Sequence, residues 1–282
     1  SKYPVAEARR NAVLLNAGFC PRTSGSMVKI LTIAGSDPSG GAGIQIDLKT
    51  FQALGAHGMA VPAALTVQCS RGVTATYPVP PRTLSRQIDM LFSDIKPDAV
   101  KTGMLLTRQN VNAVAKAART WRIRNIVVDP VIRASSGKML LRSDAVTSLK
   151  RELFPLALVI TPNIPETEVL TGMRIVTDEE MDFAAGKLLD MGPRYVLIKG
   201  GHRASGEAVD TLYGGKTVLS FSTVRLKGDF HGTGCVLSSA IAVFIGKGLP
   251  VEKAVEKAKL FVEKMLRKAK RVGKGRTKYF QF

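Results

Sequence analysis

A cysteine stands at the start of an apolar helical run near the end of the chain, behind a glycine-rich turn. The segment reads HGTGC from His231 to Cys235 and continues as VLSSAIAVFIG. If a helix begins here, the first backbone N–H groups point outwards and carry the positive end of the helix dipole, because they have no acceptor within the helix. Glycine lets an anion approach the backbone closely, and a thiol at this end of a helix is expected to have a lowered pKa. The segment predicts an anion hole with a base beside it, formed by Gly232, Thr233, Gly234 and Cys235; the alternative is a small residue that only fills the first turn.

Two other glycine-rich stretches lack a required feature of the nucleotide-binding P-loop. GSDPSGGA, residues 35–42, has the glycine spacing, but Gly41 stands where the lysine should be. GGKT, residues 214–217, has the lysine and threonine, but Asp210 occupies the position of the first glycine. A nucleotide must therefore be held in another way.

Short apolar runs alternate with segments of helical spacing from Val28 onwards. The runs VKILTIAG, AVKTGML, NIVVDPVI, ALVITPN and YVLIKGG are continuous rather than alternating, which is typical of a mostly parallel sheet covered by helices on both faces. Residues 208–226, which read AVDTLYGGKTVLSFSTVRL, predict an antiparallel hairpin at one end of that sheet. Polar residues follow the strands as GSD, QCS, TGM, DPV, TPN and KGG, and such strand ends meet at one edge of an open α/β sheet. We expect a ligand site at that edge.

Composition narrows the class of protein. The chain has 282 residues, of which 45% are hydrophobic and 22% charged, and no apolar run approaches the ~18 residues that cross a bilayer. One α/β domain accounts for the length. Cys20, Cys69 and Cys235 are odd in number and far apart, which argues against a disulfide framework or a zinc site and fits a reducing, cytoplasmic compartment.

The formal net charge of +19 is the strongest deviation from an average protein. Residues 247–278 carry twelve basic and three acidic side chains at helical spacing, which indicates a surface helix with a solvated basic face. A second interpretation is that this charge helps to hold a polyphosphate. A nucleic-acid partner is the least favoured, because the sequence has no zinc finger, RNA-recognition motif or basic zipper.

The first 26 residues are expected to lie outside the fold. They contain no long apolar core of a secretory signal, and the first convincing strand begins directly after Met27. We interpret residues 1–26 as an N-terminal extension, with an organellar transit peptide as the alternative, and residues 27–282 as one domain.

Eight motifs in a fixed order carry a resemblance to a known family. They are AGSDPSGGAGIQIDLKTFQALG, ALTVQCSRGV, KTGML, VVDPVI, ITPNIPE, IKGGH, HGTGC and VGKG. From Val28 to Gly275 the chain resembles the hydroxymethylpyrimidine and phosphomethylpyrimidine kinases of thiamine synthesis, in the ribokinase superfamily. The resemblance implies a three-layer αβα fold and phosphorylation of 4-amino-5-hydroxymethyl-2-methylpyrimidine and of its monophosphate by ATP and Mg²⁺. It also implies a homodimer.

The resemblance assigns roles to individual positions. Cys235 would orient or deprotonate the substrate hydroxyl, with the amides of residues 232–235 and Lys199 acting on the transferred phosphoryl group. Gln68 would read the aminopyrimidine, because its amide offers a donor and an acceptor side by side. The remaining pocket residues would be Gly35, Asp47, Met104 and Val131; the ATP contacts Lys199, Lys274, Asn163 and Thr233; and the Mg²⁺ ligands, direct or through water, Asp129 and Glu166.

Several residues depart from the family pattern. Cys69 and Ser70 stand where Asn and Thr are usual, Phe230 and Val236 where Thr is usual, and the tail after GKG is atypical. Two other functions therefore stay open. A pyridoxal kinase of the same superfamily would share the cysteine and the anion hole, although Gln68 favours the pyrimidine. A non-catalytic basic regulator would keep the pocket as a sensor, although the intact set of charged residues argues against it.

Overall fold

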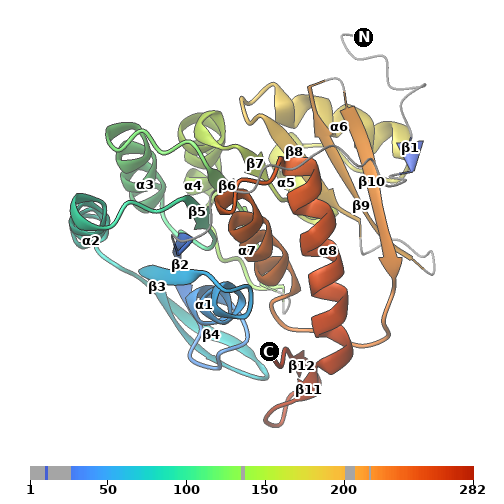
Figure 1. The fold of residues 1–282 in the computed structure, drawn as a ribbon, viewed down its shortest axis with the longest axis horizontal. Coiled ribbons are helices and arrows are strands. Elements are labelled where there is room, and N and C mark those ends of the chain that lie inside the picture. Colours follow the sequence, from blue (N-terminus) through green and yellow to red (C-terminus); the bar gives the residue numbers. More distant parts are fainter. Residues whose placement is uncertain (1–9, 12–26, 135–136, 201–206, 216) are drawn as a thin grey trace.

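A ten-stranded sheet forms the centre of the protein. The structure is a computed structural model and describes residues 10–11, 27–134, 137–200, 207–215 and 217–282. Within these residues the strand order is β1-β10-β9-β8-β7-β6-β5-β2-β3-β4 (Figure 1). The strands are β1 Arg10–Asn11, β2 Lys29–Ser36, β3 His57–Cys69, β4 Gly72–Pro78, β5 Ala99–Thr102, β6 Ile126–Val128, β7 Val159–Ile160, β8 Tyr195–Lys199, β9 Glu207–Gly214 and β10 Thr217–Val224.

The middle of the sheet is parallel, as the continuous apolar runs predict. Strands β3, β2, β5, β6, β7 and β8 pair in parallel, whereas β4, β9 and β10 are added antiparallel. The predicted hairpin is confirmed as β9 and β10. Strand β4 was not expected, because it lies at the open edge and no residue in it is buried, so it carries no apolar face that a sequence pattern would reveal.

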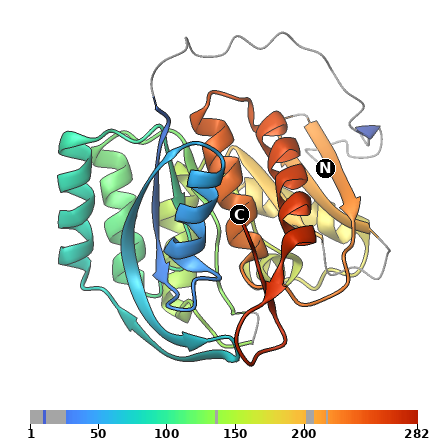
Figure 2. The same ribbon diagram turned by 60° about the horizontal axis from the view of Figure 1, so that its bottom comes forward.

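Helices cover both faces of the sheet, which confirms the three-layer αβα architecture. Helices α1, α7 and α8 pack on one face and α2, α3, α4, α5 and α6 on the other, each group with its own apolar core (Figure 2). The helices are α1 Gly43–Ala53, α2 Pro81–Asp94, α3 Arg108–Thr120, α4 Ser143–Ser148, α5 Ile164–Thr171, α6 Asp178–Leu189, α7 Thr233–Gly246 and α8 Val251–Lys268.

Helix α7 is apolar on nearly every side because it lies between α1, α8 and the sheet. Helix α8 buries one face and exposes the other, which confirms the predicted basic surface helix. Lys259 is an exception: it is buried and pairs with Asp210 of β9 at 2.6 Å, so the charge joins α8 to the sheet.

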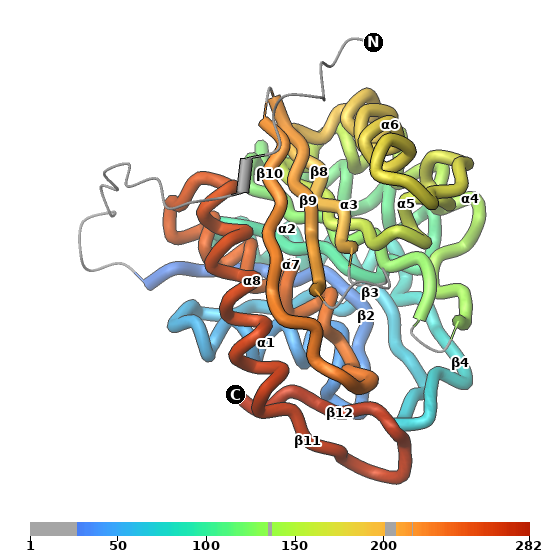
Figure 3. Tube along the Cα trace, turned by 90° about the vertical axis from the view of Figure 1, so that its right-hand side faces the viewer, coloured from blue at the N-terminus to red at the C-terminus, as the bar shows by residue number. Residues whose placement is uncertain are grey.

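The chain ends in a short hairpin that returns to the sheet edge. Strand β11, Lys270–Arg271, pairs antiparallel with β12, Lys278–Tyr279, and the loop between them carries the GKG motif (Figure 3). Phe280 is buried beyond it against α8. We call residues 270–282 the C-terminal hairpin.

Two residues of the expected N-terminal extension do belong to the sheet. Arg10 and Asn11 form β1, which pairs in parallel with Leu219 and Ser220 of β10. The expectation that residues 1–26 lie outside the fold is therefore wrong for these two residues. Residues 1–9 and 12–26, including Cys20, lie outside the described part of the chain.

Candidate active site

A cavity of about 1200 Å³ opens where the parallel strands end, as the sequence predicts. Nearly all of the predicted site residues line it. They are Gly35, Gln68, Met104, Asp129, Val131, Asn163, Glu166, Lys199, Gly232, Thr233, Gly234, Cys235 and Lys274. Asp47 is not among them.

The start of α7 has the geometry of an anion hole. Gly232 is the N-cap with a φ of 79°, a conformation that favours glycine, and no side chain caps the first turn. A Cβ on Gly232 would lie 2.0 Å from the Gly41 carbonyl oxygen, and one on Gly234 would lie 3.0 Å from Lys199 Nζ. The two glycines therefore let the GSDPSGGA loop and the Lys199 ammonium reach the helix start, where an anion would meet backbone amides and a cation together.

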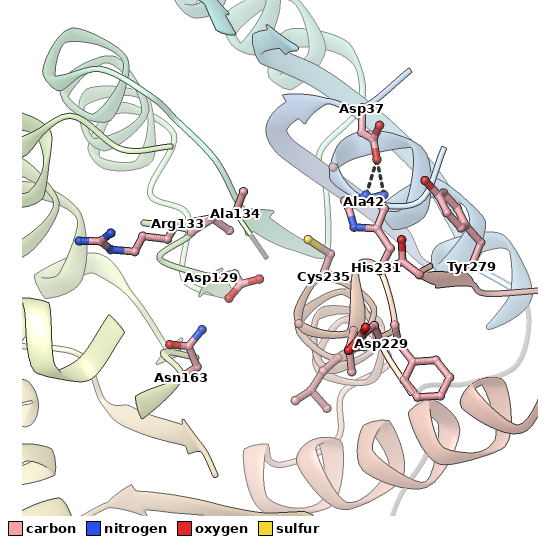
Figure 4. A pocket seen from close by; sticks show the side chains of 18 of the residues that line it. Asp37, Ala42, Asp129, Arg133, Ala134, Asn163, Asp229, His231, Cys235 and Tyr279 are labelled. Atoms are coloured by element: carbon pink, nitrogen blue, oxygen red, sulfur yellow. Dashed lines mark hydrogen bonds and ion pairs between the residues drawn. The ribbon is translucent and has the colours of Figure 1, made fainter. Parts of the chain in front are cut away.

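The thiol of Cys235 does not have the lowered pKa that its place at a helix start led us to expect. Burial raises the pKa to about 11, and the nearby Lys101 ammonium and a hydrogen bond from the Gly43 amide offset only part of that rise. Desolvation of the thiolate therefore outweighs the favourable dipole and charge at Cys235, whose side chain lies at the start of α7 (Figure 4).

Asp47 lies beneath the cavity rather than in its wall, so the prediction that it lines the pocket is wrong. Its side chain, on α1, is fully buried and accepts hydrogen bonds from Thr32 Oγ1 at 2.6 Å and Ser239 Oγ at 2.7 Å. Lys101 Nζ forms an ion pair with it at 2.8 Å. The sequence does not show that Lys101, 54 positions away on β5, is buried against this carboxylate.

Lys101 is the site residue that the sequence analysis missed most clearly. It lies within the KTGM motif, lines the cavity beside Cys235, and is fully buried. Burial favours the neutral amine, but the Asp47 charge outweighs it and raises the pKa of Lys101 above the ordinary value. The floor of the cavity therefore carries a fixed positive charge.

A second charged group forms the wall next to the anion hole. Lys199 Nζ lies 2.9 Å from Asp129 Oδ1, and Asp129 also accepts hydrogen bonds from Thr161 and Ser238. Burial would raise the pKa of Asp129, but the charges of Lys199 and Lys101 outweigh it and hold the pKa below its ordinary value. Asp129 is therefore a carboxylate at neutral pH.

Glu166, in contrast to Asp129, has a raised pKa. Burial raises its pKa to about 7, and the Asp129 charge adds to that rise, whereas Lys199 opposes it. Its oxygens accept from the backbone amides of Asn163 at 3.0 Å and Ile132 at 3.3 Å. The Asn163 side chain in turn caps α5 by accepting from the Glu166 amide at 2.8 Å, a capping box that fixes both side chains at the cavity wall.

Gln68 reaches the cavity from β3 but is not solvated as an isolated strand-end residue would be. One end of its amide lies 3.0 Å from His231 Nε2 and the other 3.2 Å from Thr66 Oγ1. His231 Nε2 also lies 2.9 Å from Asp37 Oδ2, the contact drawn in Figure 4. His231 and Asp37 belong to the quoted HGTGC and GSDPSGGA motifs, but spacing alone does not reveal that the two loops touch.

Gly35 and Met104 shape the apolar part of the cavity. A Cβ on Gly35 would lie 3.1 Å from Met104 Sδ, so the sulfur packs directly on the strand end. Met104 belongs to a small cluster with Leu106 and Leu140, against which Val131 packs. This surface is apolar, which suits contact with an aromatic ring.

Within the described residues, no group of three or more His, Cys, Asp or Glu side chains is arranged to hold a metal ion. Cys69 and Cys235 are free thiols. No described helix is long and apolar enough to cross a membrane.

The fold and the site define a kinase with a ribokinase-like fold. The family profile described as phosphomethylpyrimidine kinase matches residues 37–279. A hydroxymethylpyrimidine/phosphomethylpyrimidine kinase of Rhizobium meliloti is 46% identical over 250 residues, which are 87% of this chain and 94% of that protein. The chain belongs to the phosphomethylpyrimidine kinase family.

The similar proteins also include a longer bifunctional protein and two solved kinase structures. The thiamine biosynthesis bifunctional protein ThiED of Geobacter sulfurreducens is 45% identical over 96% of this chain, which spans only 55% of that protein. The phosphomethylpyrimidine kinase structure of Clostridium difficile is 39% identical, with a TM-score of 0.76 over 85% of this chain and 99% of its own. The pyridoxal kinase of Bacillus subtilis, in an ADP complex, is 34% identical, with a TM-score of 0.83 over 91% and 97%.

The raised pKa of Cys235 predicts a large difference in reactivity between the two described cysteines. Cys69 is exposed, and hydrogen bonds from Arg71 lower its pKa, so iodoacetamide should modify it quickly at pH 8. Cys235 should react at least 100-fold more slowly at pH 8, and its rate should keep rising towards pH 11 because the thiolate is the nucleophile. Peptide mass spectrometry after timed alkylation would measure both rates. A Cys235 rate that levels off below pH 8 would contradict the raised pKa.

Proposed function

We propose that this protein transfers the γ-phosphoryl group of ATP to the hydroxyl of 4-amino-5-hydroxymethyl-2-methylpyrimidine, and then to the phosphate of the product. The observation that carries the proposal is that one cavity brings Gln68 and the Met104 surface into line with the anion hole of α7 and Lys199. The ring site and the phosphoryl site are thus parts of one chamber. Family membership supports the same substrates, which are those named for its relatives.

The residues of the cavity divide the reaction between them. The substrate hydroxyl oxygen attacks the γ-phosphorus, the bond from that phosphorus to the β,γ-bridging oxygen breaks, and ADP leaves with the bond electrons. The amides of residues 232–235 and the Lys199 ammonium stabilise charge on the transferred group, which is most of what phosphoryl transfer requires. Lys274, exposed at the rim on the C-terminal hairpin, is placed to contact the outer phosphates.

Cys235 acts mainly by orienting the attacking hydroxyl. Its thiol has a raised pKa, so it is not a preformed base. Because the transition state of phosphoryl transfer is loose, the hydroxyl can keep its proton until late in the reaction, when the proton passes to an oxygen of the transferred phosphoryl group as the new bond to phosphorus forms. The neutral sulfur accepts a hydrogen bond from the hydroxyl and so positions it for attack.

Changes at Cys235 and Gln68 test the proposed function. Cys235→Ala should lower kcat about 10²-fold or more with little change in the KM for ATP, because the amides and Lys199 remain. Gln68→Leu should lower kcat/KM for the pyrimidine by about 10²-fold, because it removes both hydrogen bonds to the ring edge. Steady-state assays with ATP, Mg²⁺ and the pyrimidine would measure both. Near-normal turnover by Cys235→Ala would show that the sulfur only packs.

A pyridoxal kinase activity is the second candidate, because the chain is 34% identical to a pyridoxal kinase over almost all of that structure. Phosphorylation of either ring compound needs the same anion hole, so only the residues that contact the ring can distinguish the two substrates. The same assay with pyridoxal decides between them: a kcat/KM for pyridoxal above that for the pyrimidine would replace the proposed substrate.

Asp129 and Glu166 fit a magnesium ion that is shared with the nucleotide. They are buried carboxylates on one wall, and Mg²⁺ commonly takes one or two carboxylates together with water and phosphate oxygens. Burial raises the pKa of Glu166 to about 7 although the Lys199 charge opposes the rise, so a cation at this wall would stabilise the charged form. The cation would neutralise phosphate charge during transfer.

The metal assignment predicts a pH-dependent demand for Mg²⁺. Protons compete with the cation at Glu166 below its pKa of about 7, so half-saturation should need less Mg²⁺ as pH rises from 6 to 8. Glu166→Gln should raise the Mg²⁺ requirement about 10-fold or more and abolish this pH dependence, whereas Glu179→Gln on the exposed face of α6 should change neither. Mg²⁺ titrations of initial rate would show this, and an unchanged pH dependence in Glu166→Gln would remove Glu166 from the metal site.

We also infer a homodimer and a cytoplasmic location, where ATP and reduced thiols are supplied. The β3–β4 edge of the sheet exposes Leu65, Val67 and Tyr77, of which Leu65 and Tyr77 are cross-strand partners on one face. An apolar stripe on an open sheet edge is typical of an interface between protein chains. A second copy of the chain would cover it.

Two substitutions, one in the apolar stripe and one outside it, test the proposed dimer interface. Leu65→Lys should convert the dimer to a monomer in sedimentation velocity, because it places charge in the stripe. Met90→Lys, at a more exposed apolar residue on α2, should leave the dimer intact. A wild-type chain that sediments as a monomer at micromolar concentration would overturn the inference.

A further inference from the structure

His231 lies where three loops meet, and the proposed function gives it no role. Its Nε2 atom is 2.9 Å from Asp37 Oδ2 and 3.0 Å from the Gln68 amide. The edge of the Tyr279 ring faces the imidazole, with the ring centres 5.4 Å apart and the planes at 64° (Figure 4). One imidazole therefore joins the loop after β2, the end of β3 and the C-terminal hairpin.

The hydrogen bonds decide which atom of His231 carries a proton. Burial would raise the pKa of Asp37, but hydrogen bonds from His231 and Ser39 outweigh it and hold the pKa below its ordinary value, so the group is a carboxylate that only accepts. The proton must then lie on His231 Nε2. This nitrogen cannot also accept from the Gln68 amide nitrogen.

The same proton therefore fixes the Gln68 amide. The two ends of a carboxamide have the same shape, so its neighbours decide which end lies where. With the oxygen towards His231 and the NH₂ group towards Thr66 Oγ1, no two donors face each other. The Nε2 proton of His231 is then shared between Asp37 Oδ2 and the Gln68 oxygen, and Thr66, which donates its own proton to the Ser36 carbonyl at 2.9 Å, accepts from the NH₂ group. One lone pair and one N–H of Gln68 then remain for a substrate.

The C-terminal hairpin holds His231 in this position through backbone and side chain. The His231 amide donates to the Lys278 carbonyl at 3.0 Å, and the Lys278 amide donates to the Asp229 carbonyl at 2.8 Å. The Tyr279 hydroxyl donates to Ser39 Oγ at 3.2 Å, and Ser39 in turn donates to Asp37. The hairpin thus holds both the histidine and the carboxylate that orients it.

Both rings pack closely on the backbone of Gly41. A Cβ on Gly41 would lie 2.3 Å from His231 Cδ2 and 2.4 Å from Tyr279 Cε1. The GSDPSGGA loop therefore supports the imidazole on one side.

Three departures from the family pattern lie at this junction. Ser70 accepts from the Gly275 amide at 3.0 Å through Oγ and from Thr277 Oγ1 at 3.3 Å through its carbonyl. Lys278 lies 5.6 Å above the Phe230 ring. The unusual residues at 70, 230 and the tail are thus contacts between the hairpin and the site.

We propose that His231 is a positioning residue that orients the Gln68 amide through its Nε2 proton, and that the C-terminal hairpin, through Tyr279, thereby sets the ring selectivity of the site. The inference rests on the proposed function only for the identity of the ring. It assigns a role in substrate choice to the tail beyond GKG. Tyr279, in that tail, is 211 residues from Gln68 in the sequence.

Kinetics of paired variants test the proposal. His231→Leu should raise the KM for the pyrimidine about 10-fold or more and leave the KM for ATP within twofold, because one buried hydrogen bond to Gln68 is lost. His231→Gln, which keeps an N–H donor near the Nε2 position, should recover most of that loss. In a Gln68→Leu background, His231→Leu should add little, because the histidine acts through the glutamine. Tyr279→Leu should resemble His231→Leu, whereas Phe282→Leu, at the end of the same hairpin, should match the wild type.

The results that would contradict the role of His231 differ from those that would contradict the proposed substrate. Additive effects of Gln68→Leu and His231→Leu, or an equal rise in the KM for ATP, would overturn the role of His231 while the kinase assignment stands. A wild-type protein that does not phosphorylate the pyrimidine would overturn the proposed substrate instead. In that case ¹⁵N NMR of the imidazoles still tests the role of His231. The His231 signal is the one that is lost in His231→Gln. Protonation at Nε2 supports the proposal, and protonation at Nδ1 alone overturns it.

Discussion

The buried carboxylate of Asp47 is the contact on which the rest of the site depends. It joins α1 to β2 through Thr32, to β5 through Lys101 and to α7 through Ser239. Ser239 lies one helical turn beyond Cys235, so the same interaction fixes the direction in which the thiol points. Removing one partner would leave a charge in the core, which costs about 3–5 kcal/mol for buried pairs. The floor of the cavity is therefore rigid before any ligand binds.

Neighbouring ionisable groups in this cavity differ in the protonation state that their surroundings favour. Lys101 and Lys199 keep their protons, Asp129 keeps its negative charge, and Glu166 and Cys235 are both driven towards their neutral forms by burial. The cavity thus places two ammonium groups near a carboxyl group whose charged form is disfavoured by burial. The proposed nucleotide and Mg²⁺ would bring the opposite charges to these groups, which would account for such different pKa values within one cavity.

The sequence predicted the sheet, its hairpin and most of the cavity because these depend on local pattern. Continuous apolar runs indicate buried parallel strands, and polar residues at their ends must meet at one edge. Three features did not follow. The burial of Asp47 depends on Lys101, a residue 54 positions away; the pKa of Cys235 depends on how far the helix start is enclosed; and the contact of His231 with Gln68 depends on loops that meet only in the folded chain. Spacing identifies which residues can do chemistry, but not which partners they acquire.

The order in which the chain is made has a consequence for when the site is complete. The loop that carries the anion hole is held by the backbone of Lys278 and by Tyr279, which follow helix α8 in the chain. During synthesis, at about 5–20 residues per second, the sheet and its two helical layers can assemble while the C-terminal hairpin is still to be added. The cavity wall is complete only when the hairpin has been made, so a chain that stops at the end of α8 can have the fold of the kinase without its finished cavity.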